Sequence, residues 1–170
     1  MKNVDINKNA RLSQHFTLGE LCKTKTGIEN VPNEAQVENL KRLCSWLEML
    51  RSEWNNRYGG SLTPNPSPKG EGSRYKETPI IINSGYRSSQ VNKAVGGAPN
   101  SNHLTGCAAD IRCLGIEQAL RYATTLLDIS DESKEDFDEL LIEKSSRSIW
   151  VHFAVRPKDN RRKVKFLKKC

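Results

Sequence analysis

The stretch Ser101–Arg112, SNHLTGCAADIR, decides the fold of this chain. Its first half is polar and ends in Gly106, which lets the backbone turn tightly, and its second half is a run of small apolar residues typical of a buried strand. His103 lies in the predicted loop and Asp110 on the predicted strand. Because small side chains fill the gap between them, loop and strand can approach closely enough for both polar side chains to converge on one point.

Further strands are predicted on both sides of this stretch. The apolar, β-branched run TPIIIN at 78–83 indicates a buried strand before it. DELLIEK at 138–144 and SIWVHFAV at 148–155 indicate a hairpin around SSRS, and KVKFL at 163–167 can add an edge strand. Alternation along 148–155 places His152 on the face opposite to its apolar neighbours.

Helices precede and interrupt these strands. Asn33 and Gln36 can form a capping box that opens an amphipathic helix over 34–58, which stops at Gly59 and Gly60. Shorter helices are predicted from Thr17 and between Arg87 and Gly96, a longer one over 115–128, and an acidic loop over 129–136. This order favours an α+β domain with a central, mostly antiparallel sheet and flanking helices.

The length of 170 residues suits a single domain spanning 1–170. Residues 60–76 are rich in Pro, Gly and Ser without periodicity, which predicts a surface loop inserted within the domain. Residues 157–170 form a predicted basic C-terminal tail. The cysteines number five and make no CxxC pair, so reduced thiols are expected rather than a disulfide framework or a zinc ribbon.

The net charge of +7 favours anionic partners. Aromatic residues make up 6% and none alternates with the basic run, which disfavours nucleic acid; a basic nucleic-acid-binding protein is a minor alternative. No run approaches the about 20 apolar residues of a membrane span. Residues 1–16 lack the apolar stretch of a secretory signal. We expect a monomer, made in the cytoplasm without a signal peptide.

His103, Asp110 and His152 form a candidate metal site. Two imidazoles and one carboxylate are a common catalytic zinc set, and three protein ligands leave a fourth position for water. Zinc lowers the pKa of such a water to about 7, and a nearby carboxylate is still needed to take its proton. Residue types and spacing alone leave open that the histidines are packed, hydrogen-bonded residues.

Three segments, SGYRSSQVNKAVGG, SNHLTGCAADIR and WVHFAV, together resemble the D-alanyl-D-alanine carboxypeptidase-like zinc peptidases. That group includes cell-wall carboxypeptidases and phage endolysins, and shares its metal site with lysostaphin-type peptidases and the Hedgehog signalling domain. The family pattern S-x-H-x-x-G-x-A-x-D, followed by W-x-H, is present here as Ser101, His103, Gly106, Ala108, Asp110, Trp150 and His152. The resemblance implies a Hedgehog and D-Ala-D-Ala peptidase-like fold, with Zn²⁺ held by the two histidines and the aspartate.

The resemblance also implies a general base, a Glu or Asp shortly before the last histidine. Glu143 is the nearest candidate, and Asp138 and Glu139 are the alternatives. Arg87 would hold a substrate carboxylate, because its planar fork suits that group, or would pair with an acid to fix its loop. Ser101 would donate to substrate or cap the metal loop. Of two remaining candidates, Cys107 is predicted to be a packed core residue, and His15 a surface residue or a packing residue of the N-terminal segment.

The leading hypothesis is a zinc metallopeptidase that hydrolyses peptide bonds of bacterial peptidoglycan, as a D-Ala carboxypeptidase or an endopeptidase. It would act at the cell wall after release, in the manner of a phage or prophage lysis enzyme. The alternative is a zinc-binding cell-wall or interaction module on the same fold without catalysis, which loss of the general base would favour.

Overall fold

The computed structural model describes residues 7–59 and 77–168. The loop predicted at 60–76 and residues 169–170 of the predicted tail lie outside this part of the chain. The regular elements, in chain order, are α1 (Leu18–Leu21), α2 (Glu34–Tyr58), β1 (Ile82–Ser84), α3 (Ser89–Ala94), the 3₁₀ helix η1 (Asn102–Thr105), β2 (Ala108–Cys113), α4 (Ile116–Ser133), β3 (Glu139–Lys144), β4 (Ile149–Ala154) and β5 (Lys163–Lys168).

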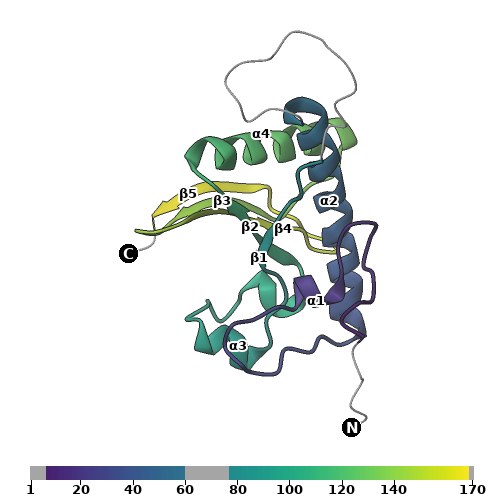
Figure 1. Ribbon diagram of the computed structural model, residues 1–170, viewed down its shortest axis with the longest axis vertical. Coiled ribbons are helices and arrows are strands. Elements are labelled where there is room, and N and C mark those ends of the chain that lie inside the picture. The colour runs from purple at the N-terminus through teal and green to yellow at the C-terminus, as the bar shows by residue number, and fades with distance from the viewer. Residues whose placement is uncertain (1–6, 60–76, 169–170) are drawn as a thin grey trace.

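A five-stranded sheet in the order β1-β2-β4-β3-β5 forms the centre of the molecule (Figure 1). Every neighbouring pair of strands is antiparallel except β3 and β5, which run parallel. The predicted α+β class with a mostly antiparallel sheet is therefore confirmed. The hairpin of β3 and β4 and the edge strand β5 also lie where the sequence indicated them, so the predicted basic tail contains a strand over Lys163–Lys168.

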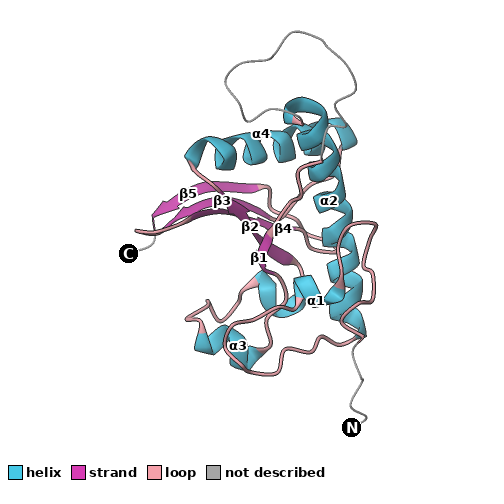
Figure 2. Ribbon diagram, viewed as in Figure 1, coloured by secondary structure: helices cyan, strands magenta, loops and turns pink. Residues whose placement is uncertain are grey.

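The helices gather around the sheet without closing over it. Figure 2 shows α4 lying across the sheet and α2 running down its side, with α1 and α3 near the opposite end of the molecule. The capping box of Asn33 and Gln36 is present at the start of α2, which has the predicted bounds. The apolar stripe of α2 is buried throughout, through Leu40, Leu43, Leu47, Leu50 and Trp54.

The core lies between α2, α4 and one face of the sheet. Trp46 of α2 packs its ring against Phe153 of β4 and Phe137, with ring centroids 5.3 Å and 6.5 Å apart. Val151 and Phe153 are fully buried on this face. Because neighbouring residues of a strand point to opposite faces, His152 lies on the other face, as the alternation predicted.

The acidic stretch predicted as a loop over 129–136 is helical up to Ser133, so that part of the prediction was wrong. Ile129 is buried, and Ser130 Oγ donates a hydrogen bond to the carbonyl of Glu135 at 2.6 Å. Burial of this apolar residue thus outweighs the polar composition of the segment. The helix ends at Lys134, whose φ of 62° is left-handed.

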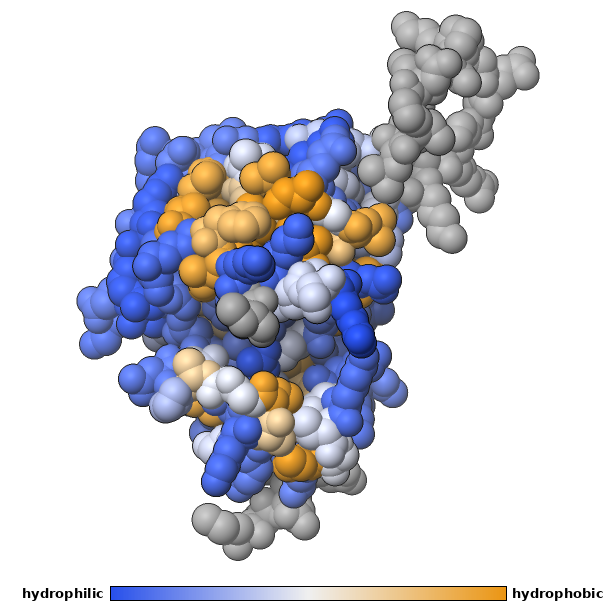
Figure 3. Space-filling view, turned by 90° about the vertical axis from the view of Figure 1, so that its left-hand side faces the viewer, coloured by the Kyte–Doolittle hydropathy of each residue, from blue (hydrophilic) through white to orange (hydrophobic). Residues whose placement is uncertain are grey.

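One apolar part of the sheet remains uncovered. Val164 and Phe166 of β5 stand opposite Leu140 and Ile142 of β3, on the helix-covered face, yet are 51% and 57% exposed. An apolar patch is visible on this side of the molecule (Figure 3). None of the described helices combines the length and apolar character that crossing a membrane would require.

Candidate metal centre

Three side chains that could hold a metal ion converge on the face of the sheet opposite the core. Asp110 of β2 stands directly opposite His152 of β4 in the antiparallel register, so the two side chains lie side by side. His103 reaches them from η1. The potential ligand atoms of these three residues all lie within 4.8 Å of one another. The predicted ligand set is thus brought together by one strand pair and one short helix.

The helix η1 is fixed by a backbone turn that needs glycine. Gly106 ends η1 with a φ of 75°, and a Cβ atom there would lie 2.6 Å from the carbonyl oxygen of Gln36 in α2. A side chain cannot be accommodated at that distance, so glycine permits η1 to sit directly on α2. His103 is held from the other side, because its carbonyl accepts a hydrogen bond of 3.0 Å from the backbone N–H of Arg87.

The ring of His103 is oriented by a backbone acceptor. Its Nδ1 lies 2.6 Å from the carbonyl oxygen of Gly85, and its Nε2 lies 3.2 Å from Asp110 Oδ1. Burial lowers the pKa of His103, against the opposing charge of Asp110. A neutral imidazole that donates from Nδ1 to a carbonyl presents the Nε2 lone pair to the site, which is the usual arrangement of a metal-binding histidine.

The ring of His152 lies between two carboxylates. Its Nδ1 is 2.9 Å from Asp110 Oδ1, and its Nε2 is 3.6 Å from Glu139 Oε2. Burial would lower the pKa of His152, but the contacts with Asp110 and Glu139 raise it to about 9. Burial would likewise raise the pKa of Asp110, but His103 and His152 hold it well below its usual range.

This donor set fits a zinc ion. It comprises two imidazole nitrogens and one carboxylate, all buried and presented by η1, β2 and β4. Zinc takes such ligands in tetrahedral geometry, leaving one position open in catalytic sites. The negative charge of Asp110 interacts with both imidazole rings. A bound cation would take the place of the ring protons in this interaction, because a metal ligand must be deprotonated.

Arg87 lies beside the predicted ligands. Its Nη2 donates a hydrogen bond of 2.5 Å to Asp110 Oδ2, and its Nε donates one of 2.8 Å to Ser84 Oγ. Pairing with an acid, the alternative considered from sequence, is therefore present, and substrate contact stays a prediction. Ser101 Oγ accepts a hydrogen bond of 3.3 Å from the backbone N–H of His103, so this residue caps η1.

Three carboxylates were candidates for the general base. Leu141 of β3 stands opposite His152, so Glu139 and Glu143, two residues to either side, share the face of His152. Glu143 stands opposite Trp150 and is 6% exposed, and its charge helps raise the pKa of His152. Asp138 directly precedes β3 and does not share this face with Glu139 and Glu143.

Asp138 is fully buried and held by other partners. Arg161 donates to both of its carboxylate oxygens at 2.8 and 2.7 Å, and Asn102 donates to Oδ2 at 2.7 Å. These contacts lower the pKa of Asp138 against the effect of its burial. Its role is to tie η1 and the segment before β5 to the start of β3.

Glu139 is the residue whose place sequence reasoning undervalued. Lys163 Nζ lies 2.7 Å from its Oε1, Arg161 Nη2 lies 3.1 Å from the same atom, and Asn102 Nδ2 donates to Oε2 at 3.2 Å. The feature that could have identified it is its spacing: Glu139 lies two residues before Leu141, the residue opposite His152, and so shares the face of His152. That signal requires the strand register, which the sequence does not state.

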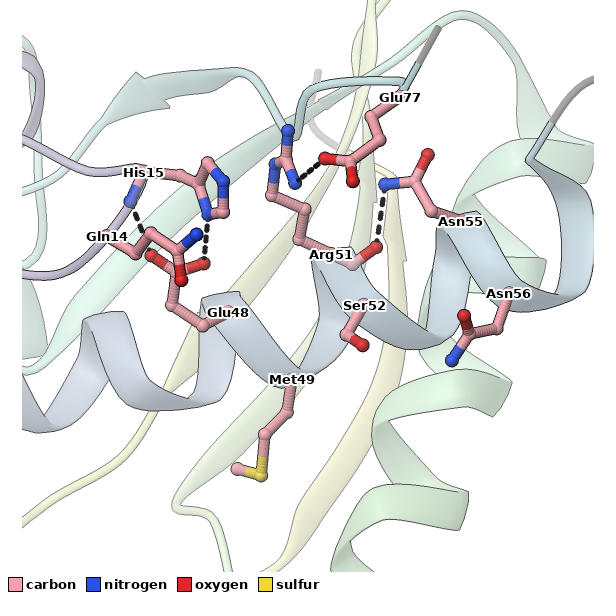
Figure 4. A pocket seen from close by; sticks show the side chains of 9 residues that line it. All are labelled: Gln14, His15, Glu48, Met49, Arg51, Ser52, Asn55, Asn56 and Glu77. Carbon is pink, nitrogen blue, oxygen red and sulfur yellow. Dashed lines mark hydrogen bonds and ion pairs between the residues drawn. The ribbon is translucent and has the colours of Figure 1, made fainter. Parts of the chain in front are cut away.

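His15 and Cys107 take no part in the metal centre. His15 Nδ1 lies 2.7 Å from Glu48 Oε2 of α2, beside a polar cavity of about 400 Å³ (Figure 4). The cavity is lined by Gln14, His15, Glu48, Met49, Arg51, Ser52, Asn55, Asn56 and Glu77. Cys107 is buried, and its Sγ lies 3.9 Å from the carbonyl oxygen of Thr105.

Comparison with known proteins agrees with this geometry. Residues 72–152 match the family model described as Peptidase M15. No curated protein matches the chain. The matched segment contains the three potential ligands as well as Arg87 and Glu143. Over residues 72–152, the match therefore supports the predicted resemblance to the D-alanyl-D-alanine carboxypeptidase-like family Peptidase M15.

Proposed function

We propose that this protein is a zinc-dependent peptidase that hydrolyses peptide bonds of bacterial peptidoglycan. The observation that carries the proposal is the convergence of His103, Asp110 and His152 on the face of the sheet opposite the core, with Glu139 and Glu143 on the same face. The Peptidase M15 match supports the reaction class. The peptidoglycan substrate rests on the resemblance to cell-wall carboxypeptidases, and the basic charge of the chain suits an anionic wall.

The ligands would be His103 Nε2, a carboxylate oxygen of Asp110 and His152 Nδ1. Zinc, when bound, lowers the pKa of a coordinated water and polarises the substrate carbonyl. Arg87 holds Asp110 Oδ2, which leaves Oδ1 directed at both imidazoles. The arginine therefore orients the carboxylate ligand, and its remaining N–H groups can donate to a substrate carboxylate.

Glu143 is the proposed general base. It lies on the same face of the sheet as the candidate ligands. It is also a diagonal cross-strand neighbour of His152, and the Cα atoms of such pairs are about 7–8 Å apart. Its carboxylate would accept the proton of the attacking water and deliver it to the leaving nitrogen. Glu139 on the other diagonal is held by Lys163, Arg161 and Asn102.

The test combines metal analysis with substrate digestion. Elemental analysis of the purified protein is expected to give one zinc per chain. Digestion of purified peptidoglycan by the wild type should release peptide products. No products should be released when a chelator is present or when the Glu143→Gln variant is used. Absence of zinc from a folded, metal-supplied protein would overturn the metal centre.

The products also separate the possible modes of action. Released D-alanine would identify a carboxypeptidase, and larger stem or cross-link fragments an endopeptidase. A protein that binds zinc but releases nothing, with Glu143→Gln indistinguishable from wild type, would instead be a binding module on the same fold.

A further inference from the structure

Glu139 lies between His152 and the C-terminal edge strand. Its Oε1 faces two cations, with Lys163 Nζ at 2.7 Å and Arg161 Nη2 at 3.1 Å. Its Oε2 faces the metal centre, with Asn102 Nδ2 at 3.2 Å and His152 Nε2 at 3.6 Å. The side chain is 14% exposed. The two oxygens are thus differently used, one to anchor the carboxylate and one to approach the imidazole.

The two candidate histidine ligands have matching environments. In His103 one ring nitrogen faces Asp110 and the other lies 2.6 Å from the carbonyl of Gly85. In His152 Nδ1 lies 2.9 Å from Asp110 and the other nitrogen faces Glu139. Each ring therefore presents one nitrogen to the common point and the other to an oxygen acceptor. The two rings use opposite nitrogens, Nε2 for His103 and Nδ1 for His152.

We infer that Glu139 is a positioning residue, which accepts the Nε2–H of His152 and so keeps Nδ1 available as the metal ligand. The inference rests on the metal centre of the proposed function. An imidazole without such an acceptor distributes its proton between both nitrogens and turns more freely about its side-chain bonds. An acceptor on the distal nitrogen selects one tautomer, fixes the ring and makes the ligating nitrogen more basic.

The basic C-terminal segment supplies the cations that anchor Glu139. Lys163 begins β5, which pairs in parallel with β3 and places it beside Glu139 in the register. Arg161 precedes β5 and contacts Asp138 as well as Glu139. The cations hold the carboxylate in place while its second oxygen turns to His152.

The experiment measures zinc affinity, not turnover. Glu139→Leu removes the acceptor, and zinc affinity measured by competition with a chromogenic chelator is expected to fall by about 10–100-fold, as for other outer-sphere partners of metal ligands. Glu139→Gln keeps an acceptor oxygen and should restore most of the affinity. Glu143→Leu is the matched control, because Glu143 occupies the mirror-image diagonal from His152. It removes a charge that also acts on His152, but it should lower zinc affinity by less than Glu139→Leu does.

Several results would overturn the inference. Wild-type zinc affinity in Glu139→Leu would do so, as would equal losses in Glu139→Leu and Glu143→Leu. Full zinc affinity with abolished turnover in both Glu139 variants would make this residue the general base instead. A wild type that binds no zinc would overturn the proposed function rather than the role of Glu139.

A spectroscopic measurement on the wild type covers the case in which Glu139→Leu does not fold. Long-range ¹⁵N–¹H correlation spectra of the zinc-loaded protein report which nitrogen of His152 carries the proton. The inference requires the proton on Nε2. A proton on Nδ1 would contradict it.

Discussion

Replacing Gly106 by alanine is expected to destabilise the protein by about 2–5 kcal/mol. The left-handed φ of 75° costs a non-glycine residue about 1–2 kcal/mol. The new Cβ would also lie 2.6 Å from the carbonyl oxygen of Gln36, so η1 must move away from α2. Movement weakens two hydrogen bonds of 2.9 Å, from Gln36 Nε2 to Leu104 O and from Asn39 Nδ2 to Thr105 O, each worth about 0.5–1.5 kcal/mol.

Gly96→Ala provides a control that separates these contributions. Gly96 has a φ of 68°, but nothing lies within 4 Å of a Cβ built there. Urea unfolding of the metal-free proteins should therefore give Gly96→Ala only the conformational cost of about 1–2 kcal/mol. Gly106→Ala should lose more free energy of unfolding than this control, and should also bind zinc more weakly, since His103 moves with η1. Equal losses in the two variants would refute the packing argument.

Zinc affinity, measured by chelator competition, should increase as the pH rises from about 6.5 to about 9, because His152, whose pKa in the metal-free protein is raised to about 9, must lose its proton to bind. The stability of the metal-free protein should change in the opposite direction, because the stabilisation by protonated His152 is fully present below about pH 6.5 and is lost as the pH rises through about 9. A zinc affinity that does not depend on pH would contradict both expectations. Asp138→Asn should lower the free energy of unfolding by about 1–3 kcal/mol, because it breaks the charged contact with Arg161. Since the pKa of Asp138 is lowered, the difference between variant and wild type in urea titrations should shrink as the pH falls below about 4; a constant difference would refute this. Arg87→Lys should reduce kcat/KM on a soluble stem peptide by about 10–100-fold, because a single ammonium nitrogen cannot reproduce the separate contacts of the guanidinium with Asp110 and Ser84, and an unchanged value would exclude this role.

Much of the fold follows from local signals. The capping box of Asn33 and the apolar stripe after it predict α2 with its observed bounds, because both are properties of residues three or four positions apart. The alternation around His152 correctly assigns its face, because side-chain direction in a strand depends only on residue parity. Such features can be predicted without knowing which segments meet.

The remaining features depend on contacts between distant segments. The polar composition of 129–136 predicts a loop, yet burial of Ile129 extends α4 by five residues from Ile129 to Ser133. Arg87 donates to Asp110, and the sequence alone does not show whether this arginine binds a carboxylate of the protein or one of a substrate. Ranking Glu139 against Glu143 likewise requires the register of β3 with β4 and the parallel pairing with β5.

Long-range contacts also join η1 to Asp138 and to Glu139 at the start of β3. Asn102, the residue before the first histidine ligand, donates to Asp138 Oδ2 at 2.7 Å and to Glu139 Oε2 at 3.2 Å. Displacement of η1 would therefore also disturb the carboxylate facing His152. Because the two candidate histidine ligands share this support, loss of one should loosen the other, so their substitutions should be non-additive in zinc affinity. The candidate metal centre accordingly depends on contacts among η1, β2, β3 and β4, so its three candidate ligands are not independent of one another.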